Sequence, residues 1–336
     1  MTGNAWICRR LSNALSAVIK SQCNRLETLN ITSTSVRYFS VSQSRKMKFV
    51  QFTRKDHPSE TRVGYVVGDN VVDINKSDSR LSSTLLDILK KGDIEKVRLM
   101  SSKGEGTAAI PLSSVNLVAP IHGMDKVICI GLNYKDHCEE QNMPLPPVPI
   151  FFSKFSSTVI GPNEPVRLRT NIAKKVDYEV ELTLVIGKTA SNVKAAEAYD
   201  YILGYTVAQD ISARDWQKDR NGGQFLLGKT QDTFCPIGPW IVTGDETGDP
   251  QNLAIKCSVN GDLRQSSKTD QLIHKIPYVI ERLTSLMTLL PGDIILTGTP
   301  GGVGLYLKPP QFLKPGDVVR SEIENIGVLE TKIDQF

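Results

Sequence analysis

The chain has 336 residues, of which 40% are hydrophobic and 23% charged, which is ordinary for a globular protein with ample length for a core. No uninterrupted apolar run is long enough to span a bilayer, so we expect no membrane segment. The net charge is +4, and residues 1–39 carry all of it, because the rest of the chain has 35 basic and 35 acidic residues. A neutral body gives no electrostatic reason to expect nucleic-acid binding.

Residues 1–39 have the composition of a mitochondrial transit peptide. They contain five basic residues and one acid and are rich in Ser, Thr and Asn, and their apolar residues recur at helical spacing. Arg37-Tyr38-Phe39-Ser40 resembles a matrix-processing site that is cleaved after Phe39. The alternative is a disordered tail, which acid depletion combined with a helical period disfavours. We therefore expect a protein of the mitochondrial matrix.

The cysteines indicate no disulfide framework. No CxxC motif occurs, and the matrix is a reducing compartment, so we expect free and mostly buried thiols. Outside the leader, which holds Cys8 and Cys23, the cysteines are Cys129, Cys138, Cys235 and Cys257.

Residues 47–115 are expected to form a small α+β module. Alternating apolar residues predict short strands, and a later apolar run predicts a helix that begins after Ser82, Ser83 or Thr84. Residues 111–120, which begin and end with proline, are expected to be a linker. The expected strands are 48–52, 62–67 and 71–73, and the expected helix is centred on 85–89.

Residues 120–336 are expected to form the main domain, in which strand signals dominate. Two near copies, 290–295 and 314–319, each predict a Pro-Gly turn that delivers a strand. Many strands with few helices favour a β-rich α+β domain over a βαβ one. The other expected strands are 127–130, 177–186 and 203–209, and the expected helices are 136–141 and 195–201.

The strongest local signal is Asp177-Tyr178-Glu179-Val180-Glu181. Alternate side chains of a strand share a face, so Glu179 and Glu181 point the same way. Two stacked carboxylates repel one another and, if buried, need a cation. An isolated pair of this kind is more often a solvated strand face, so the pair alone is weak support for a metal site.

A third carboxylate, Asp210, ends an apolar strand. A helical turn after it would place Arg214 and Gln217 on the same side, which makes a plausible site for a metal and an anion. The alternative is a helix N-cap aspartate with an ion pair four residues on. Local sequence does not decide between the two.

His137 and Glu140 are three residues apart and hence neighbours on a helix. A carboxylate beside an imidazole fixes its tautomer and raises its basicity, which is the simplest general-base pair. Of the four histidines, His137 alone has this setting. A surface histidine on a helix is the equally plausible alternative.

Lys229 follows an apolar run, so a partly buried lysine with an acidic partner or a lowered pKa is expected there, unless the side chain merely reaches the surface.

The glycine-rich segment 298–304 lacks the Lys-Ser/Thr of a phosphate loop and opens no helix, so we reject a nucleotide site. Its amides are still candidates to contact a substrate carboxylate.

Together these segments resemble the fumarylacetoacetate hydrolase superfamily. The resemblance covers roughly residues 120–336 and is specific, because five motifs occur in the family's order. Residues 153–155 and 224–239 resemble one branch of it, which is associated with oxaloacetate tautomerisation. The five motifs are Gly131-Leu132-Asn133-Tyr134 with His137 and Glu140, then 177–181, then Gln209-Asp210 with Arg214-Asp215, then Gly228-Lys229, and finally 296–300.

The resemblance implies a β-rich, roll-like catalytic domain and a homodimer. It also implies a divalent cation, usually Mg²⁺, bound by Glu179, Glu181 and Asp210. Carboxylates without His or Cys suit Mg²⁺, Mn²⁺ or Ca²⁺ rather than Zn²⁺. By the same resemblance His137, Glu140 and Lys229 are candidate catalytic residues, and Arg214, Gln217 and Thr299 are candidate contacts of a small anionic oxo-acid.

Members of the superfamily hydrolyse C–C bonds, decarboxylate oxaloacetate, or interconvert its enol and keto forms. All three reactions develop negative charge on an oxygen, which a bound cation stabilises, so a metal motif does not distinguish them. We favour tautomerisation, with hydrolysis of an acylpyruvate or decarboxylation as alternatives. A non-catalytic module with a structural cation is disfavoured, since such a site needs no base.

Overall fold

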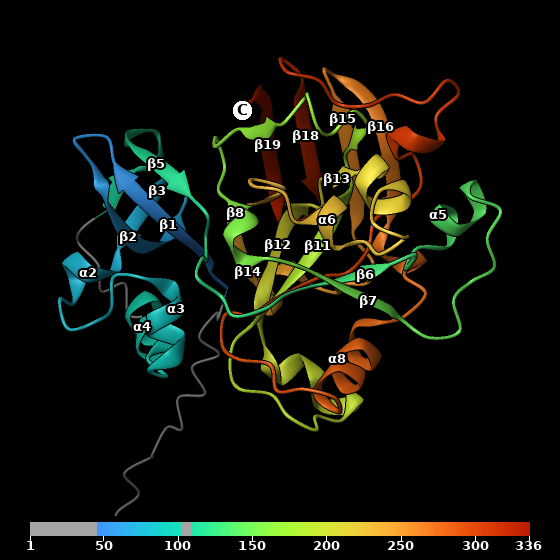
Figure 1. The fold of residues 1–336 in the computed structure, drawn as a ribbon. Helices are drawn as coiled ribbons and strands as arrows, with labels where there is room; N and C mark the ends of the chain where they lie inside the picture. Colours follow the sequence, from blue (N-terminus) through green and yellow to red (C-terminus); the bar gives the residue numbers. More distant parts are fainter. Residues whose placement is uncertain (1–45, 103–108) are drawn as a thin grey trace, which may run out of the picture. The chain divides into compact units, whose positions relative to one another are not determined.

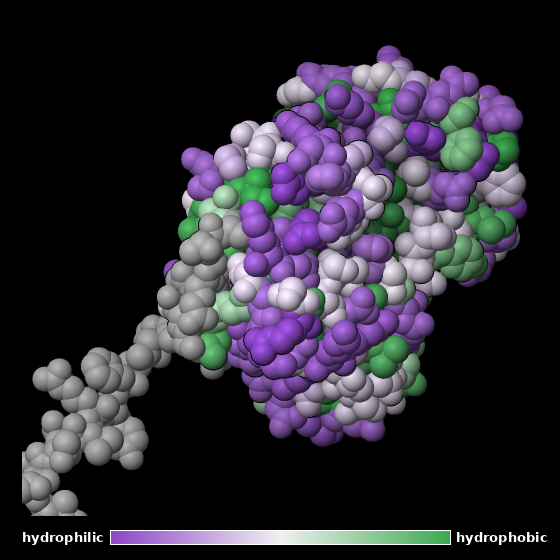
Figure 2. All heavy atoms as spheres, turned by 90° about the vertical axis from the view of Figure 1, so that its left-hand side faces the viewer, coloured by the Kyte–Doolittle hydropathy of each residue, from purple (hydrophilic) through white to green (hydrophobic). Residues whose placement is uncertain are grey.

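The computed structural model describes residues 46–102 and 109–336 (Figure 1). The expected transit peptide lies outside the described residues. Those residues form a strand-rich α+β fold, as predicted, and belong to one compact unit. None of their helices is long and apolar enough to cross a membrane. On the face seen in Figure 2 hydrophilic residues predominate and hydrophobic ones lie in small groups, as on a surface that faces water.

The N-terminal module contains the expected strands and helix. The helix begins after Thr84, whose hydroxyl accepts the N–H of Asp87 at 3.1 Å, so the capping prediction is confirmed. Its elements are β1 (Lys48–Arg54), β2 (His57–Val67), β3 (Asn70–Asp73), α2 (Ile74–Ser77), α3 (Leu85–Lys90), α4 (Ile94–Ser102) and β4 (Ala109–Pro111).

The prediction of a linker at 111–120 is wrong for most of that segment. After the short helix η1 (Leu112–Ser114), β5 (Val115–Val118) pairs antiparallel with β1. The bounding prolines suggested a loop, but the alternation between them is that of a strand, and pairing with a distant strand decided the outcome. Near its start the same edge of β1 pairs with β14 (Cys235–Thr243), while β2 occupies the opposite edge, so one sheet continues from the module into the main domain.

The main sheet runs in the order β4-β3-β2-β1-β14-β12-β11-β17-β6-β7, and a second sheet runs β16-β15-β18-β19-β9. In the first sheet β12 (Ile202–Gln209) and β11 (Val180–Ile186) pair antiparallel, with buried residues throughout β11. Its remaining strands are β17 (Ile294–Leu296), β6 (Val127–Gly131), β7 (Ile150–Lys154) and β8 (Val159–Ile160). The second sheet, at the upper right of Figure 1, has β9 (Val166–Leu168), β15 (Ala254–Val259), β16 (Asp262–Lys268), β18 (Val318–Ile323) and β19 (Gly327–Gln335).

Helices are few, as the strand-dominated sequence predicted. The segment 136–141 forms a helix nearly as expected, and 195–201 forms a 3₁₀ helix. Besides η4, which is described below, the helices of the main domain are α5 (Lys135–Glu140), η2 (Ser156–Thr158), η3 (Ala195–Tyr201), α6 (Leu226–Lys229), α7 (Gly244–Thr247), η5 (Thr269–Gln271), α8 (Ile276–Thr284) and η6 (Gly304–Tyr306).

The two Pro-Gly turns are structural repeats, as predicted. Their glycines have positive φ, 91° at Gly292 and 95° at Gly316. The aspartate after each glycine, Asp293 or Asp317, accepts the N–H of the first residue of its turn at 2.8 or 2.9 Å. Each turn therefore closes on its own side chain before β17 or β18 begins.

Two local predictions are wrong near the site. The strand expected at 177–186 is split into β10 (Val176–Asp177) and β11, because the N–H of Glu179 bonds the side chain of Gln209 at 2.9 Å instead of a neighbouring strand. No helical turn follows Asp210: β13 (Ser212–Ala213) pairs with β10, and a π-helix, η4 (Asp215–Asp219), comes next.

Candidate metal and active site

Three carboxylates meet where β11 begins and β12 ends. The antiparallel register sets Val180 opposite Gln209, and the N–H of Asp210 donates to the carbonyl of Glu179 at 2.9 Å. Glu179, Glu181 and Asp210 each offer an oxygen, and these oxygens lie within 4.8 Å of one another. All three residues are buried, with exposures of 5%, 2% and 0%. The alternative of a solvated strand face is therefore wrong, and the carboxylates form a cluster.

Three buried cations surround the cluster. Lys229 Nζ lies 2.6 Å from Glu179 Oε2 and 2.5 Å from Asp210 Oδ2, which are the acidic partners expected for a buried lysine. Lys154 Nζ lies 2.6 Å from Asp210 Oδ1. Arg214 Nη2 lies 2.7 Å from Glu179 Oε1. Asp210 thus pairs with two lysines, and the expected contact with Arg214 is replaced by one between Arg214 and Glu179.

The two glutamates differ in their electrostatics. Burial alone would raise the pKa of Glu179, but Lys229 and Arg214 outweigh it and lower that pKa. The pKa of Glu181 is raised well above its usual value, first by burial and then by the charges of Asp210 and Glu179. Glu181 forms no ion pair with the described residues and accepts one N–H, from Gly298 at 2.6 Å. It is the carboxylate that most needs further positive charge.

The donor set fits a hard divalent cation. It consists of carboxylate oxygens alone, which suits Mg²⁺, Mn²⁺ or Ca²⁺. Asp177, which Arg214 contacts at 2.8 Å, is a fourth carboxylate beside the cluster. The four carboxylates and the three cations Lys154, Lys229 and Arg214 together give the site a net charge of −1. A divalent cation would change this to +1, which favours an anionic ligand.

Arg214 is held mainly by the protein. Its Nε donates to Asp177 at 2.9 Å, and its Nη1 donates to Gln217 Oε1 at 3.0 Å. The side-chain N–H groups of Gln217 have no partner among the described residues and are available to a ligand in the pocket. The structure brings Arg214 and Gln217 together as predicted, although through a π-helix and not through a turn that includes Asp210.

His137 and Glu140 form the predicted pair on α5. His137 Nδ1 lies 2.5 Å from Glu140 Oε1, and the second oxygen of Glu140 accepts the N–H of Gly302 at 2.8 Å. The ring of Tyr306 stands edge-on to the imidazole, with the ring centres 6.3 Å apart. The Tyr306 hydroxyl donates to Gln141 at 2.8 Å and accepts from an exposed lysine. The imidazole is thus fixed from two sides.

The glycine-rich segment serves the protein's own carboxylates. Amides that we expected to contact a substrate donate instead to acidic side chains: Gly298 to Glu181, Gly302 to Glu140, and Gly304 to Asp177. A Cβ at Gly304 would lie 1.9 Å from a backbone oxygen, so this close approach requires glycine. The sequence showed that the segment was unusual, but not which acids it would meet.

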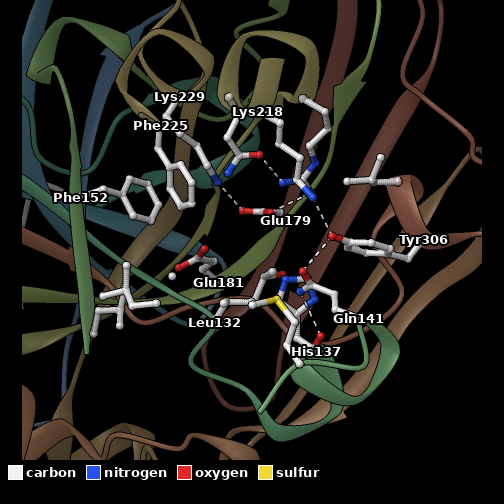
Figure 3. A pocket seen from close by; sticks show the side chains of 18 residues that line it. Leu132, His137, Gln141, Phe152, Glu179, Glu181, Lys218, Phe225, Lys229 and Tyr306 are labelled. Carbon is white, nitrogen blue, oxygen red and sulfur yellow. Dashed lines mark hydrogen bonds and ion pairs between the residues drawn. The ribbon is translucent and has the colours of Figure 1, made fainter. Parts of the chain in front are cut away.

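A cavity of about 210 Å³ is lined by the polar residues His137, Glu179, Glu181, Arg214, Gln217 and Lys229 (Figure 3). His137 faces Glu179 and Glu181 across it, and Lys229 lies on the same side as Glu179. Thr299 also lines it, but its hydroxyl already accepts from Gln265 at 2.7 Å and donates to Val180 at 3.0 Å. Gln141, Lys218 and Tyr306 line it too. The apolar part of the wall is formed by Ile130, Leu132, Met143, Ile150, Phe152, Phe225 and Leu305.

Sequence reasoning missed three contributors, Lys154, Asp177 and Tyr306. Asp177 precedes the glutamates within the motif that we singled out, so its position was a usable signal. Lys154 ends a strand whose partners were unknown, and 56 residues separate it from Asp210. The four cysteines of the main domain are free and buried, as predicted.

Comparison with known proteins agrees with this site. The family model "Fumarylacetoacetate (FAA) hydrolase C-terminal" matches residues 126–334. The chain is 46% identical over 299 residues to oxaloacetate tautomerase fahd2, mitochondrial, of Xenopus laevis, covering 88% of this chain and 93% of that protein. It is 48% identical over 291 residues to oxaloacetate tautomerase Fahd2a, mitochondrial, of Rattus norvegicus, covering 86% and 92%.

A solved structure resembles it as well. Maleylpyruvate hydrolase from Sphingobium sp. SYK-6, in complex with manganese (II) ion and pyruvate, superposes with a TM-score of 0.70 at 30% identity, covering 86% of this chain and 99% of that one. The family match spans more than half of the chain, and the relatives match nearly all of it. The chain belongs to the fumarylacetoacetate hydrolase family.

Proposed function

We propose that this protein is a metal-dependent oxaloacetate tautomerase that converts the enol form of oxaloacetate to the keto form. The observation that carries the proposal is one pocket lined by Glu179, Glu181 and His137, with Asp210 beside the glutamates and Glu140 bonded to the histidine. Relatives of 46% and 48% identity bear the name oxaloacetate tautomerase. The two features match a reaction that needs charge stabilisation and one mobile proton.

Glu179, Glu181 and Asp210 would hold the cation, for which we propose Mg²⁺, with Mn²⁺ or Ca²⁺ as alternatives. When bound, the cation would act as a Lewis acid that stabilises negative charge on a substrate oxygen. Once the metal ion is bound, the carboxylates, the neighbouring Lys and Arg side chains and the metal together carry a net positive charge. A small anionic oxo-acid is therefore the expected ligand.

His137 would move the proton. It takes the proton of the enol hydroxyl and delivers a proton to carbon 3, so that the imidazole is restored after each turnover. Glu140 orients the ring and stabilises its charged form. Burial alone would lower the pKa of Lys229, but Asp210 and Glu179 outweigh it and raise that pKa, so Lys229 is better suited to holding charge than to removing a proton.

Arg214, Gln217 and Thr299 would contact the substrate. Gln217 and Arg214 both keep donor capacity. The two amide N–H groups of Gln217 have no partner among the described residues, and Arg214 Nη2, although it lies beside Asp177 and Glu179, makes no hydrogen bond with them. We therefore place the main positioning contacts at Gln217 and Arg214.

A panel of oxo-acids tests the proposed reaction. Purified protein, with Mg²⁺ or with a chelator, is given enol-oxaloacetate and an acylpyruvate, and both tautomerisation and C–C cleavage are followed. We expect Mg²⁺-dependent loss of the enol without release of CO₂ or pyruvate. Dominant cleavage of the acylpyruvate would identify a hydrolase, and dominant CO₂ release would identify a decarboxylase.

We also propose a matrix location, because close relatives are named mitochondrial and residues 1–39 have transit-peptide composition. The mature protein isolated from mitochondria is expected to begin near Ser40, as N-terminal sequencing would show. A native N-terminus within residues 1–10 would contradict this expectation.

A homodimer is a further proposal, made on the family resemblance. Strand β7 ends the order of the main sheet, and Ile150 in it and Phe155 just beyond it are 40% and 53% exposed. A free edge beside exposed apolar side chains is a surface that a second copy would cover.

A further inference from the structure

Lys154 is a buried cation that the proposed proton transfer does not use. It ends β7, and its side chain is fully inaccessible to solvent. Its Nζ donates to Asp210 Oδ1 at 2.6 Å and to the carbonyl of Ile211 at 3.1 Å. Lys154 does not line the pocket, and Asp210 is the one carboxylate among the described residues with which it forms an ion pair.

Lys154 and Lys229 each contact a different carboxylate oxygen of Asp210. Lys154 holds Oδ1, and Lys229 holds Oδ2 at 2.5 Å. Each oxygen has two lone pairs, so each can still bind one further partner. A cation chelated by both oxygens would have to lie beside both ammonium groups, whereas a cation on one oxygen avoids one of them. Like-charge repulsion therefore favours binding through a single oxygen.

The number of oxygens per carboxylate matters differently to different cations. Mg²⁺ demands about six ligands in near-ideal octahedral geometry and keeps several waters. Ca²⁺ accepts roughly six to eight oxygens and often takes both oxygens of a carboxylate. A site in which each carboxylate binds through one oxygen suits Mg²⁺. A carboxylate that is free to bind through both oxygens increases the affinity for Ca²⁺ more than the affinity for Mg²⁺.

We propose that Lys154 is a positioning residue that restricts Asp210 to a single donor oxygen and so biases the site toward Mg²⁺ over Ca²⁺. The inference rests on the proposed metal site and is independent of which oxo-acid the enzyme converts. It adds a determinant of ion choice at a distance from the substrate.

Two effects of removing Lys154 must be separated. Loss of a positive charge strengthens the attraction of the cluster for any divalent cation, and it does so for Mg²⁺ and Ca²⁺ alike. Release of Asp210 Oδ1 permits chelation, which benefits Ca²⁺ more. The ratio of the two dissociation constants cancels the first effect and reports the second.

The experiment measures Mg²⁺ and Ca²⁺ binding by isothermal titration to wild-type protein and to Lys154→Met, Lys154→Gln, Lys154→Arg and Lys126→Met. Lys126→Met is the matched control, because Lys126 Nζ lies 3.4 Å from the buried carboxylate of Asp293, outside the cluster. Circular dichroism verifies folding. Outer-shell partners of a metal ligand typically change metal affinity by about 10–100-fold. We expect the Ca²⁺/Mg²⁺ ratio of dissociation constants to fall by about tenfold or more in Lys154→Met.

Lys154→Gln should show the same fall, since its shorter side chain does not reach Asp210, and it decides the matter if Lys154→Met does not fold. Lys154→Arg and Lys126→Met should keep the wild-type ratio. Equal changes in both affinities would overturn the proposal, because charge alone would then explain them. Wild-type protein that binds Ca²⁺ more tightly than Mg²⁺ would overturn it without any variant. Wild-type protein that binds neither ion would refute the metal site itself.

Discussion

Glu181→Gln is expected to abolish metal-dependent activity while the protein remains folded. Glu181 forms no ion pair with any residue that the structure describes, and a glutamine carbonyl can still accept the N–H of Gly298. The change removes one negative charge and one ligand from the proposed cation site. Mg²⁺ affinity should therefore fall beyond the roughly 10–100-fold that loss of an outer-shell partner costs. Isothermal titration measures it. Thermal unfolding without metal should occur above the wild-type temperature, because the change removes a buried carboxylate whose pKa burial and its acidic neighbours raise.

Asp210→Ala should lose the metal too, but for Asp210 we expect a loss of stability as well. Its carboxylate is fully buried and neutralises two ammonium groups, Lys154 and Lys229. Lys229 keeps Glu179 as a partner, whereas Lys154 keeps only the carbonyl of Ile211. A buried charge that loses its partner typically costs about 3–5 kcal/mol, which denaturant titration of the metal-free protein resolves.

A double variant isolates the cause of that loss. Asp210→Ala combined with Lys154→Met removes the orphaned ammonium group together with its partner, so part of the stability should return. Full stability in Asp210→Ala alone would mean that water or a counter-ion reaches Lys154. Normal Mg²⁺ affinity in Glu181→Gln or Asp210→Ala would refute the proposed ligand set.

The contacts that could be predicted from the sequence are those between residues only a few positions apart in the chain. The His137–Glu140 pair needs only a helix, and the Glu179–Glu181 pair needs only an extended chain. Each pair is fixed by local geometry, which motifs encode directly. Asp210 was added to the glutamates through the family resemblance, and the register of β11 and β12 explains why they meet.

Contacts between distant segments were not predictable in the same way. Lys154 and Asp210 are 56 residues apart, and Arg214 and Asp177 are 37 apart. Which strand ends meet depends on the order of the whole sheet, and no local pattern specifies that order. The misassigned linker has the same origin, since β5 is a strand because β1 offers it an edge. A lysine at a strand end is normally read as a surface residue, and only the tertiary fold buries Lys154.

His137→Ala separates chemistry from binding. If His137 moves the proton, its loss should lower kcat by about 10²- to 10⁴-fold and leave KM and Mg²⁺ affinity nearly unchanged. His57→Ala is the matched control, because His57 is exposed on β2 and lines no part of this pocket, so its kinetics should equal those of wild type. Stopped-flow measurement of enol loss supplies the rates.

Glu140→Gln then tests whether the two residues act as one unit. Its amide must turn an N–H group either to Gly302, which is itself a donor, or to His137, whose Nδ1 can accept it only without a proton. Either the Gly302 contact or the imidazole tautomer that a carboxylate selects is therefore lost. The loss of kcat should be smaller than for His137→Ala, since the base remains. Adding Glu140→Gln to His137→Ala should change the rate little, because the glutamate has no other proposed role in the reaction. If His137→Ala instead raises KM alone, His137 binds substrate and the proton travels by another route. Normal turnover in His137→Ala would likewise contradict the mechanism and would make Lys229 the first residue to test.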